Sequence, residues 1–157
     1  MKKFLMIVGA IAVFGFTAMI VLLVFAAFGL NETNKEAKAY VAESIEAIAT
    51  QWDENALLVR ATPELREYFQ PGQLETFLGD SSRAIGGLET LGEINCFSNS
   101  SVTTSEGKKS SSECTGEGVH ARGRAEYRVN AIKKDGEWRL NSFYVTYYPE
   151  EDGSTEV

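Results

Sequence analysis

The 157-residue chain has few of the residues from which catalytic and metal sites are commonly built: one histidine, two cysteines and three prolines. A single histidine excludes a histidine-rich metal site, and no Ser-His-Asp or Cys-His arrangement can be read. Neither a CxxC pair nor a glycine-rich phosphate loop occurs. The sequence therefore predicts no catalytic residue, no cofactor and no metal. His120 is expected to be an exposed residue beside a turn.

Basic residues are also in the minority, since 15 Lys and Arg stand against 22 Asp and Glu. Lys2 and Lys3 are the only charges before residue 32, so the rest of the chain carries 13 − 22 = −9. Phosphate contacts require clustered Lys and Arg. The charge balance therefore argues against a nucleic-acid partner.

Charge is absent altogether from residues 4–30. As a helix this run would span about 40 Å at 1.5 Å per residue, more than the roughly 30 Å of a bilayer's hydrocarbon core. A cleaved secretory signal is the alternative, but its apolar region usually has only about 7 to 15 residues. The sequence predicts an uncleaved transmembrane helix over 4–30 behind a cytoplasmic stub, residues 1–3.

The flanking charges predict the orientation of this helix. Lys2 and Lys3 precede it, whereas the four charges within 32–38 sum to zero. By the positive-inside rule, the N-terminus is cytoplasmic and the C-terminal part is periplasmic or extracellular, in a single-pass protein of the cell (inner) membrane. Small residues that would let another membrane helix approach closely recur within the run: Gly9, Ala12, Gly15 and Ala18.

Helical periodicity follows the membrane run. Large apolar residues at i, i+4, i+7 and i+11 predict an amphipathic helix with one buried face: Val41, Ile45, Ile48 and Trp52. Thr62 before Pro63 predicts an N-cap and a second, short helix that ends at 71–72. A third helix is expected before the glycine pair at 86–87.

From residue 88 the periodicity becomes two, which predicts strands. We expect a strand over 88–97, a mobile Ser/Thr-rich tip over 98–113, a second strand to about 119, a turn at 121–123 and a third strand around 125–131. Alternation in the third strand predicts one buried face and one wet face, with Glu126, Arg128 and Asn130 on the wet one. Asp135-Gly136 predicts a tight hairpin, because both central residues of a type I′ turn need positive φ. The last strand changes parity after Leu140, and a β-bulge near 141–142 would keep its apolar residues on the core face.

The two cysteines, Cys96 and Cys114, are equidistant from Ser105 in the predicted tip. A hairpin folding there would place them opposite one another, and an extracytoplasmic location favours a disulfide. The same register sets Glu93 against Glu117, an unfavourable like-charge pair that a slip or a bulge would relieve. A redox pair is the alternative, although catalytic pairs usually lie close together at a helix start.

Helices followed by an antiparallel sheet indicate an α+β fold over residues 31–148, with helices packed on a curved sheet of about four strands. Three segments carry a resemblance: the helix 41–52, ATPELREYF (61–69) and DGEWRLNSFYV (135–145). They resemble small extracytoplasmic domains of the cystatin-like, nuclear-transport-factor-two-like superfamily. That resemblance implies a cone-shaped sheet, often with an apolar pocket, used mostly for binding or assembly and occasionally for catalysis, as in ketosteroid isomerase. The acidic tail, 149–157, is expected to be disordered.

Two sets of residues are candidates for binding. A pocket or core groove between helix and sheet would be lined by Val41, Ile45, Ile48, Trp52, Tyr127, Trp138 and Leu140. Arg122, Arg124 and Arg128 form a small basic cluster that would contact an anion or a partner's acidic groups; a solvated face around Glu126 is the alternative. Strand tyrosines such as Tyr127 are expected to pack with a wet tip.

These observations favour a non-enzymatic accessory or assembly module of an envelope membrane complex. Its partners would be the lipid bilayer and another envelope or membrane protein, and a homo-oligomer stays open. The alternative is a protein with a pocket that binds, or isomerises, a small lipophilic ligand. An acid with a raised pKa inside the pocket would distinguish the second function.

Overall fold

The computed structural model describes residues 32–104 and 107–150, with the side chains in these ranges except those of 99–108. The predicted stub 1–3, the predicted membrane helix 4–30 with its small residues Gly9, Ala12, Gly15 and Ala18, and the tail after residue 150 lie outside them. No helix among the described residues has the length and apolar character needed to span a bilayer.

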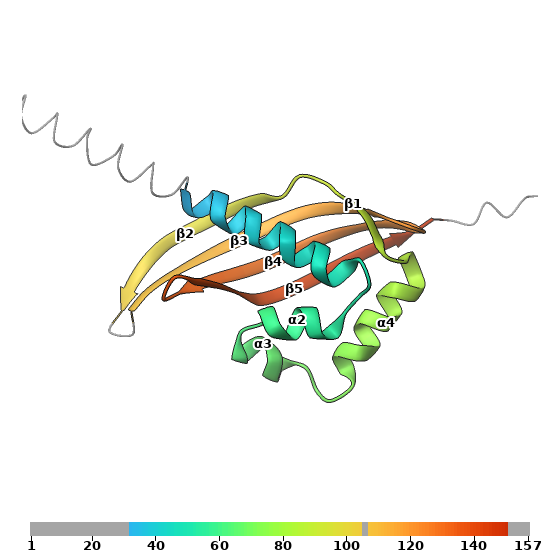
Figure 1. Cartoon of the computed structure of the whole chain (residues 1–157), viewed down its shortest axis with the longest axis horizontal. Coiled ribbons are helices and arrows are strands. Elements are labelled where there is room, and N and C mark those ends of the chain that lie inside the picture. Colours follow the sequence, from blue (N-terminus) through green and yellow to red (C-terminus); the bar gives the residue numbers. More distant parts are fainter. Residues whose placement is uncertain (1–31, 105–106, 151–157) are drawn as a thin grey trace, which may run out of the picture. The chain divides into compact units, whose positions relative to one another are not determined.

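The described chain has an α+β fold, as expected, with four helices before five antiparallel strands. A long helix covers 32–49. It is followed by α2 (Glu54–Arg60), α3 (Pro63–Tyr68), α4 (Gln73–Ile85), β1 (Leu88–Leu91), β2 (Asn95–Thr104), β3 (Gly107–His120), β4 (Gly123–Lys134) and β5 (Glu137–Pro149). Figure 1 shows the long helix lying across a curved sheet, with α2, α3 and α4 gathered beside β5. The sheet has one strand more than the sequence predicted.

The extra strand arises because the predicted strand 88–97 is interrupted. The chain leaves the ladder between β1 and β2, both of which pair with β3. In the segment that connects the two strands, the N–H of Gly92 donates to the carbonyl of Glu117 at 2.8 Å, and the carboxylate of Glu93 pairs with Lys38 Nζ at 2.9 Å. The like-charge pair that a regular hairpin would set between Glu93 and Glu117 is thereby avoided.

The Ser/Thr-rich tip was predicted wrongly. Most of 98–113 belongs to β2 and β3, which continue to residue 104 and from residue 107. The cysteine prediction is confirmed: Cys96 and Cys114 are direct cross-strand partners and form a disulfide with an S–S distance of 2.02 Å.

Several short sequence motifs adopt the local structures that were predicted for them. The Oγ1 of Thr62 accepts the N–H of Leu65 at 3.2 Å, which caps α3 with Pro63 in its first turn. Asp135 and Gly136 both have positive φ, 53° and 87°, at the β4–β5 hairpin. The predicted bulge lies at Asn141, because the register shifts between the pairs 130/142 and 131/140.

The long helix was predicted three residues too long. It ends at residue 49, and Trp52 lies in the following turn with a φ of 53°. A new helix, α2, then begins, because the side chain of Asp53 accepts the N–H of Asn55 at 2.9 Å. This helix has seven residues and only Leu57 buried, too little apolar periodicity to be recognised in the sequence.

The core lies between the helices and one face of the sheet. The predicted helix stripe is buried there with residues of β4 and β5, among them Tyr127 and Leu140. Trp138 is partly buried against the same core and stacks on Tyr40 with ring centroids 6.4 Å apart. The sequence prediction that Trp138 and Leu140 join the helix stripe in one core is therefore confirmed.

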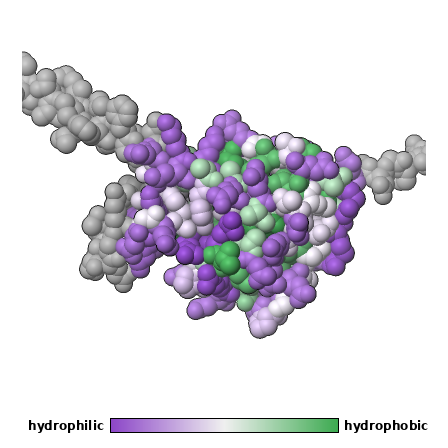
Figure 2. Space-filling model, viewed as in Figure 1, coloured by the Kyte–Doolittle hydropathy of each residue, from purple (hydrophilic) through white to green (hydrophobic). Residues whose placement is uncertain are grey.

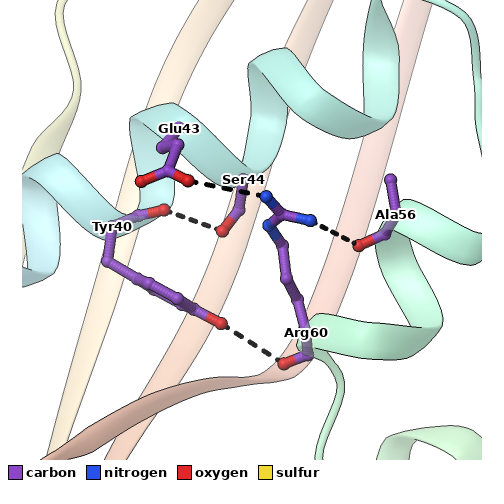
Figure 3. A network of polar contacts seen from close by, with 5 residues as sticks. All are labelled: Tyr40, Glu43, Ser44, Ala56 and Arg60. Atoms are coloured by element: carbon purple, nitrogen blue, oxygen red, sulfur yellow. Dashed lines mark hydrogen bonds and ion pairs between the residues drawn. The ribbon is translucent and has the colours of Figure 1, made fainter.

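A polar network joins the long helix to α2 (Figure 3). The guanidinium of Arg60 lies 3.5 Å from the carboxylate of Glu43 and donates to the carbonyl of Ala56 at 3.2 Å. The hydroxyl of Tyr40 donates to the carbonyl of Arg60 at 3.3 Å, and Ser44 donates back to the carbonyl of Tyr40 at 2.7 Å. The Tyr40 bond satisfies the last carbonyl of α2, and this bond and the Arg60–Glu43 ion pair join α2 to the long helix.

Candidate functional site

The face of the sheet turned away from the helices is open to solvent. Along β4, buried residues alternate with exposed ones, so that Arg124, Glu126 and Arg128 share the open side. Their neighbours on β3 and β5 are also exposed. We call this surface the outer face. It is formed by Phe97, Glu113, Thr115, Glu117, Val119, Arg124, Glu126, Arg128, Tyr144, Thr146 and Tyr148.

Large apolar side chains gather on the outer face. Phe97, Val119, Tyr144 and Tyr148 are exposed by 72%, 50%, 59% and 44%, and they are four of the seven large apolar side chains exposed in the described chain. The side of the molecule seen in Figure 2 shows hydrophobic patches among hydrophilic side chains. Aromatic residues and arginine are enriched in protein interfaces, whereas glutamate is depleted there; the outer face carries both kinds of residue.

The centre of the outer face carries four charges. Glu117 of β3 lies directly opposite Glu126 of β4, and Arg124 and Arg128 flank Glu126 on β4. Like charges directly opposite one another destabilise a sheet. None of these four side chains takes part in the ion pairs found within the described chain. The guanidinium of Arg124 lies over the Tyr148 ring, 5.9 Å from its centroid.

A hollow of about 640 Å³ lies over this charged centre. It reaches from the β1–β2 connection to β5, and its lining includes Glu93, Glu117, Glu126, Arg128 and Tyr144. Cavities of roughly 300–1,000 Å³ are the usual size for ligand sites. This one presents carboxylates and a guanidinium together, and therefore suits an occupant that carries charges of both signs.

The three arginines that were predicted to form one cluster do not lie together. Arg124 and Arg128 lie together on the outer face, but Arg122 lies in the β3–β4 turn. Its guanidinium donates to the carbonyls of Ser82 and Arg83, both at 2.9 Å. Arg122 thus satisfies the carbonyls at the end of α4, and this bonding assigns it a structural role.

The sequence analysis did not predict that Glu117 and Glu126 are cross-strand partners. The turn predicted at 121–123 could have shown it, because two strands that fold back there place these residues opposite one another. Alternation along β4 correctly predicted the exposed side of Glu126, but no register was assigned between β3 and β4.

A second cavity, of about 350 Å³, is mostly apolar. It lies between α3, α4 and β5, and its lining includes Leu65, Tyr68, Phe69, Phe77 and Phe143. It is not the pocket expected between the long helix and the sheet. Of the seven residues expected there, six are buried in the packed core and Trp138 is partly buried against it.

His120 was predicted wrongly as an exposed residue, since it is only 3% exposed. It ends β3, where its ring stacks on Trp52 with centroids 5.5 Å apart. Its Nδ1 lies 3.0 Å from the carbonyl of Gly86, and its Nε2 lies 2.7 Å from the hydroxyl of Tyr127. Trp52 Nε1 also donates to Gly86, at 2.8 Å.

The hydroxyl of Tyr127 is correspondingly buried rather than wet. Tyr127 is 2% exposed, and burial raises the pKa of its hydroxyl. Burial also lowers the pKa of His120, although the carbonyl of Gly86 opposes that shift. The pair is thus a neutral hydrogen-bonded element of the core, and its position joins the turn at Trp52 to the end of β3.

Nothing in the described side chains resembles a metal centre, since no three His, Cys, Asp or Glu residues gather closely enough there. No protein-family model matches the chain, and neither a curated protein nor a solved structure matches it.

Proposed function

We propose that the chain is a single-pass, membrane-anchored extracytoplasmic module that binds another protein, as an accessory subunit of an envelope membrane complex. The observation that carries this proposal is the outer face. It combines exposed aromatic side chains, charges with no ion-pair partner in the described chain, and a polar hollow. Exposed apolar groups gathered on one face mark interaction sites.

Support for the location comes from the disulfide and the charge pattern. The Cys96–Cys114 bond suits an oxidising compartment. The uncharged run 4–30, preceded by Lys2 and Lys3, supports an anchor with its N-terminus in the cytoplasm. The fold supports the resemblance to the cystatin-like, nuclear-transport-factor-two-like superfamily in one respect, because a long helix lies across a curved antiparallel sheet.

A non-enzymatic role is favoured by where the reactive side chains lie. His120 and Tyr127 are enclosed in the core and bonded to each other. The charged groups of the outer face are exposed on a sheet surface. A partner protein can bind to such an exposed surface without an enclosed reaction site.

The test purifies the full chain through a C-terminal tag after mild detergent extraction of its native membranes. Phe97→Ala with Tyr148→Ala removes two aromatic rings from the outer face, and Val59→Ala removes an exposed apolar side chain from α2, away from both cavities, as the control. We expect the wild type and the control to retain a membrane protein at a fixed ratio, either a different protein or an untagged copy of this chain, and the double variant to lose most of it. Equal retention by all three, or no retained protein, would contradict the proposal.

The apolar cavity beside β5 favours one second candidate, the binding of a small lipophilic ligand. Its lining by aromatic rings from α3, α4 and β5 suits an aliphatic or aromatic molecule. In that case, solvent extraction of the purified chain should release a lipophile at a fixed ratio. Phe77→Ser should abolish its release, whereas the outer-face variant should leave it unchanged.

A further inference from the structure

We infer that the outer face is self-complementary and docks onto the outer face of a second copy of this chain, forming a two-fold homodimer. This inference rests on the proposed function, because it takes the outer face as the docking surface. It names the protein bound there as a second copy of the chain, and it names the charges that recognise that copy.

The charges at the centre of the face carry the inference. Two carboxylates, Glu117 and Glu126, and two guanidinium groups, Arg124 and Arg128, lie on adjacent strands. In a two-fold contact, residue i of one copy meets residue j of the other, and j meets i. One Glu–Arg contact between copies therefore forms twice, and the opposed carboxylates gain the cations that they lack within the described chain.

The balance of these charges allows two copies to approach. The chain after residue 31 carries −9, which makes most of its surface a poor partner for itself. The central quartet sums to zero, with two acids and two arginines, and Glu113 brings the outer face to 2 − 3 = −1. Electrostatic complementarity of this kind selects partners and suppresses wrong ones, and it favours this face over the acidic remainder of the domain.

Aromatic side chains flank the quartet. Tyr144 and Tyr148 of β5 lie directly opposite Arg128 and Arg124 on β4, and Phe97 lies on β2, toward the other edge. Two sheets that pack face to face are separated by about 10 Å and interdigitate their side chains. The rings would then exclude water from the ion pairs, which strengthens them.

Anchoring in one membrane would further favour the contact. Two copies with the same orientation share a plane, and tethering raises the effective concentration of one docking surface for another. A two-fold axis normal to the membrane relates two such copies, so the proposed symmetry is compatible with the proposed anchor.

The test is a charge reversal between two differently tagged full-length chains, co-expressed and extracted in mild detergent. Glu117→Arg with Glu126→Arg makes the quartet fully basic, and Arg124→Glu with Arg128→Glu makes it fully acidic. Glu67→Arg with Glu75→Arg, on exposed positions of α3 and α4, makes the same charge change away from the face. The single variants Glu126→Arg and Arg128→Glu repeat the test with less perturbation, and thermal unfolding checks that each variant is folded.

We expect wild-type chains and the control to recover their differently tagged copies. Basic–basic and acidic–acidic pairs should lose about tenfold or more of that recovery, and a basic–acidic pair should regain it. The inference is wrong if wild-type copies do not recover each other, if a basic–basic pair associates as the wild type does, or if folded basic and acidic chains fail to pair. If the wild type lacks self-association but retains a different protein through the outer face, the dimer fails and the proposed function stands.

Discussion

Acidification should destabilise the fold through the buried His120–Tyr127 pair. The carbonyl of Gly86 can only accept, so the hydrogen of the neutral ring lies on Nδ1, and Nε2 accepts the hydroxyl of Tyr127. A protonated ring would donate from both nitrogens. The Tyr127 hydroxyl would then have to turn, in a site where that side chain is 2% exposed. The carboxylate of Glu89 partly offsets the cost of protonating the ring, because its negative charge raises the pKa of His120.

The sign follows from the pKa of His120, which burial lowers below its ordinary value. Between that lowered pKa and about 6.5, the unfolded chain binds more protons than the folded chain, so the free energy of unfolding falls as the pH falls. One such group contributes a slope of at most about 1.4 kcal/mol per pH unit. Lowering the pH from 7.5 to 5.5 should therefore cost up to about 1.4 kcal/mol and lower the melting temperature by a few degrees.

The assay is thermal unfolding of the full chain in mild detergent at pH 7.5, 6.5 and 5.5. His120→Gln should remove most of the loss over this window, because ordinary carboxyl groups titrate near pH 4. Tyr127→Phe should cost about 1–3 kcal/mol at pH 7.5, since it leaves Nε2 buried without its donor. The reasoning would be refuted if the wild type were equally stable at the three pH values, or if His120→Gln kept the same pH dependence.

Further changes test the core, the backbone and the disulfide. Ile48→Ala should cost about 2–5 kcal/mol by leaving a cavity, and a loss no larger than that of the exposed control Glu46→Ala would contradict the helix-on-sheet core. Gly87→Ala should destabilise because the new methyl group would collide with a backbone carbonyl, whereas Gly79→Ala in α4 has room and should stabilise by roughly 0.5–1 kcal/mol; chemical denaturation that ranks them in the reverse order would be contrary evidence. Thiol labelling should find no free thiol before reduction, and removing the disulfide should cost about 3 kcal/mol, because it closes a loop with a sequence separation of 18.

Local chemistry made several parts of the fold predictable. The Thr62-Pro63 cap, the Asp135-Gly136 hairpin and the bulge at Asn141 each depend on a few adjacent residues. The alternating pattern of β4 likewise gave the exposed side of Glu126 before any pairing was known. These features need no knowledge of distant segments.

Features set by distant segments were not predictable in the same way. His120 stands one residue before a turn, and its burial comes from Trp52, 68 positions earlier, stacking on its ring. The residues between β1 and β2 bond to Lys38 and to the backbone of Glu117, both of which are distant from them in the sequence. The outer face became a candidate site only when the register set Glu117 against Glu126.

The proposed function requires an uncleaved anchor that holds this domain outside the cytoplasm, and the topology of the full chain tests that requirement most directly. A reporter enzyme that is active only outside the cytoplasm is fused after Val157, and the N-terminus of the membrane-extracted protein is sequenced. We expect an active reporter in the membrane fraction on a chain that keeps its first 30 residues. An active cytoplasmic reporter in the matched fusion would contradict the orientation, and a mature N-terminus near Asn31 would contradict the anchor.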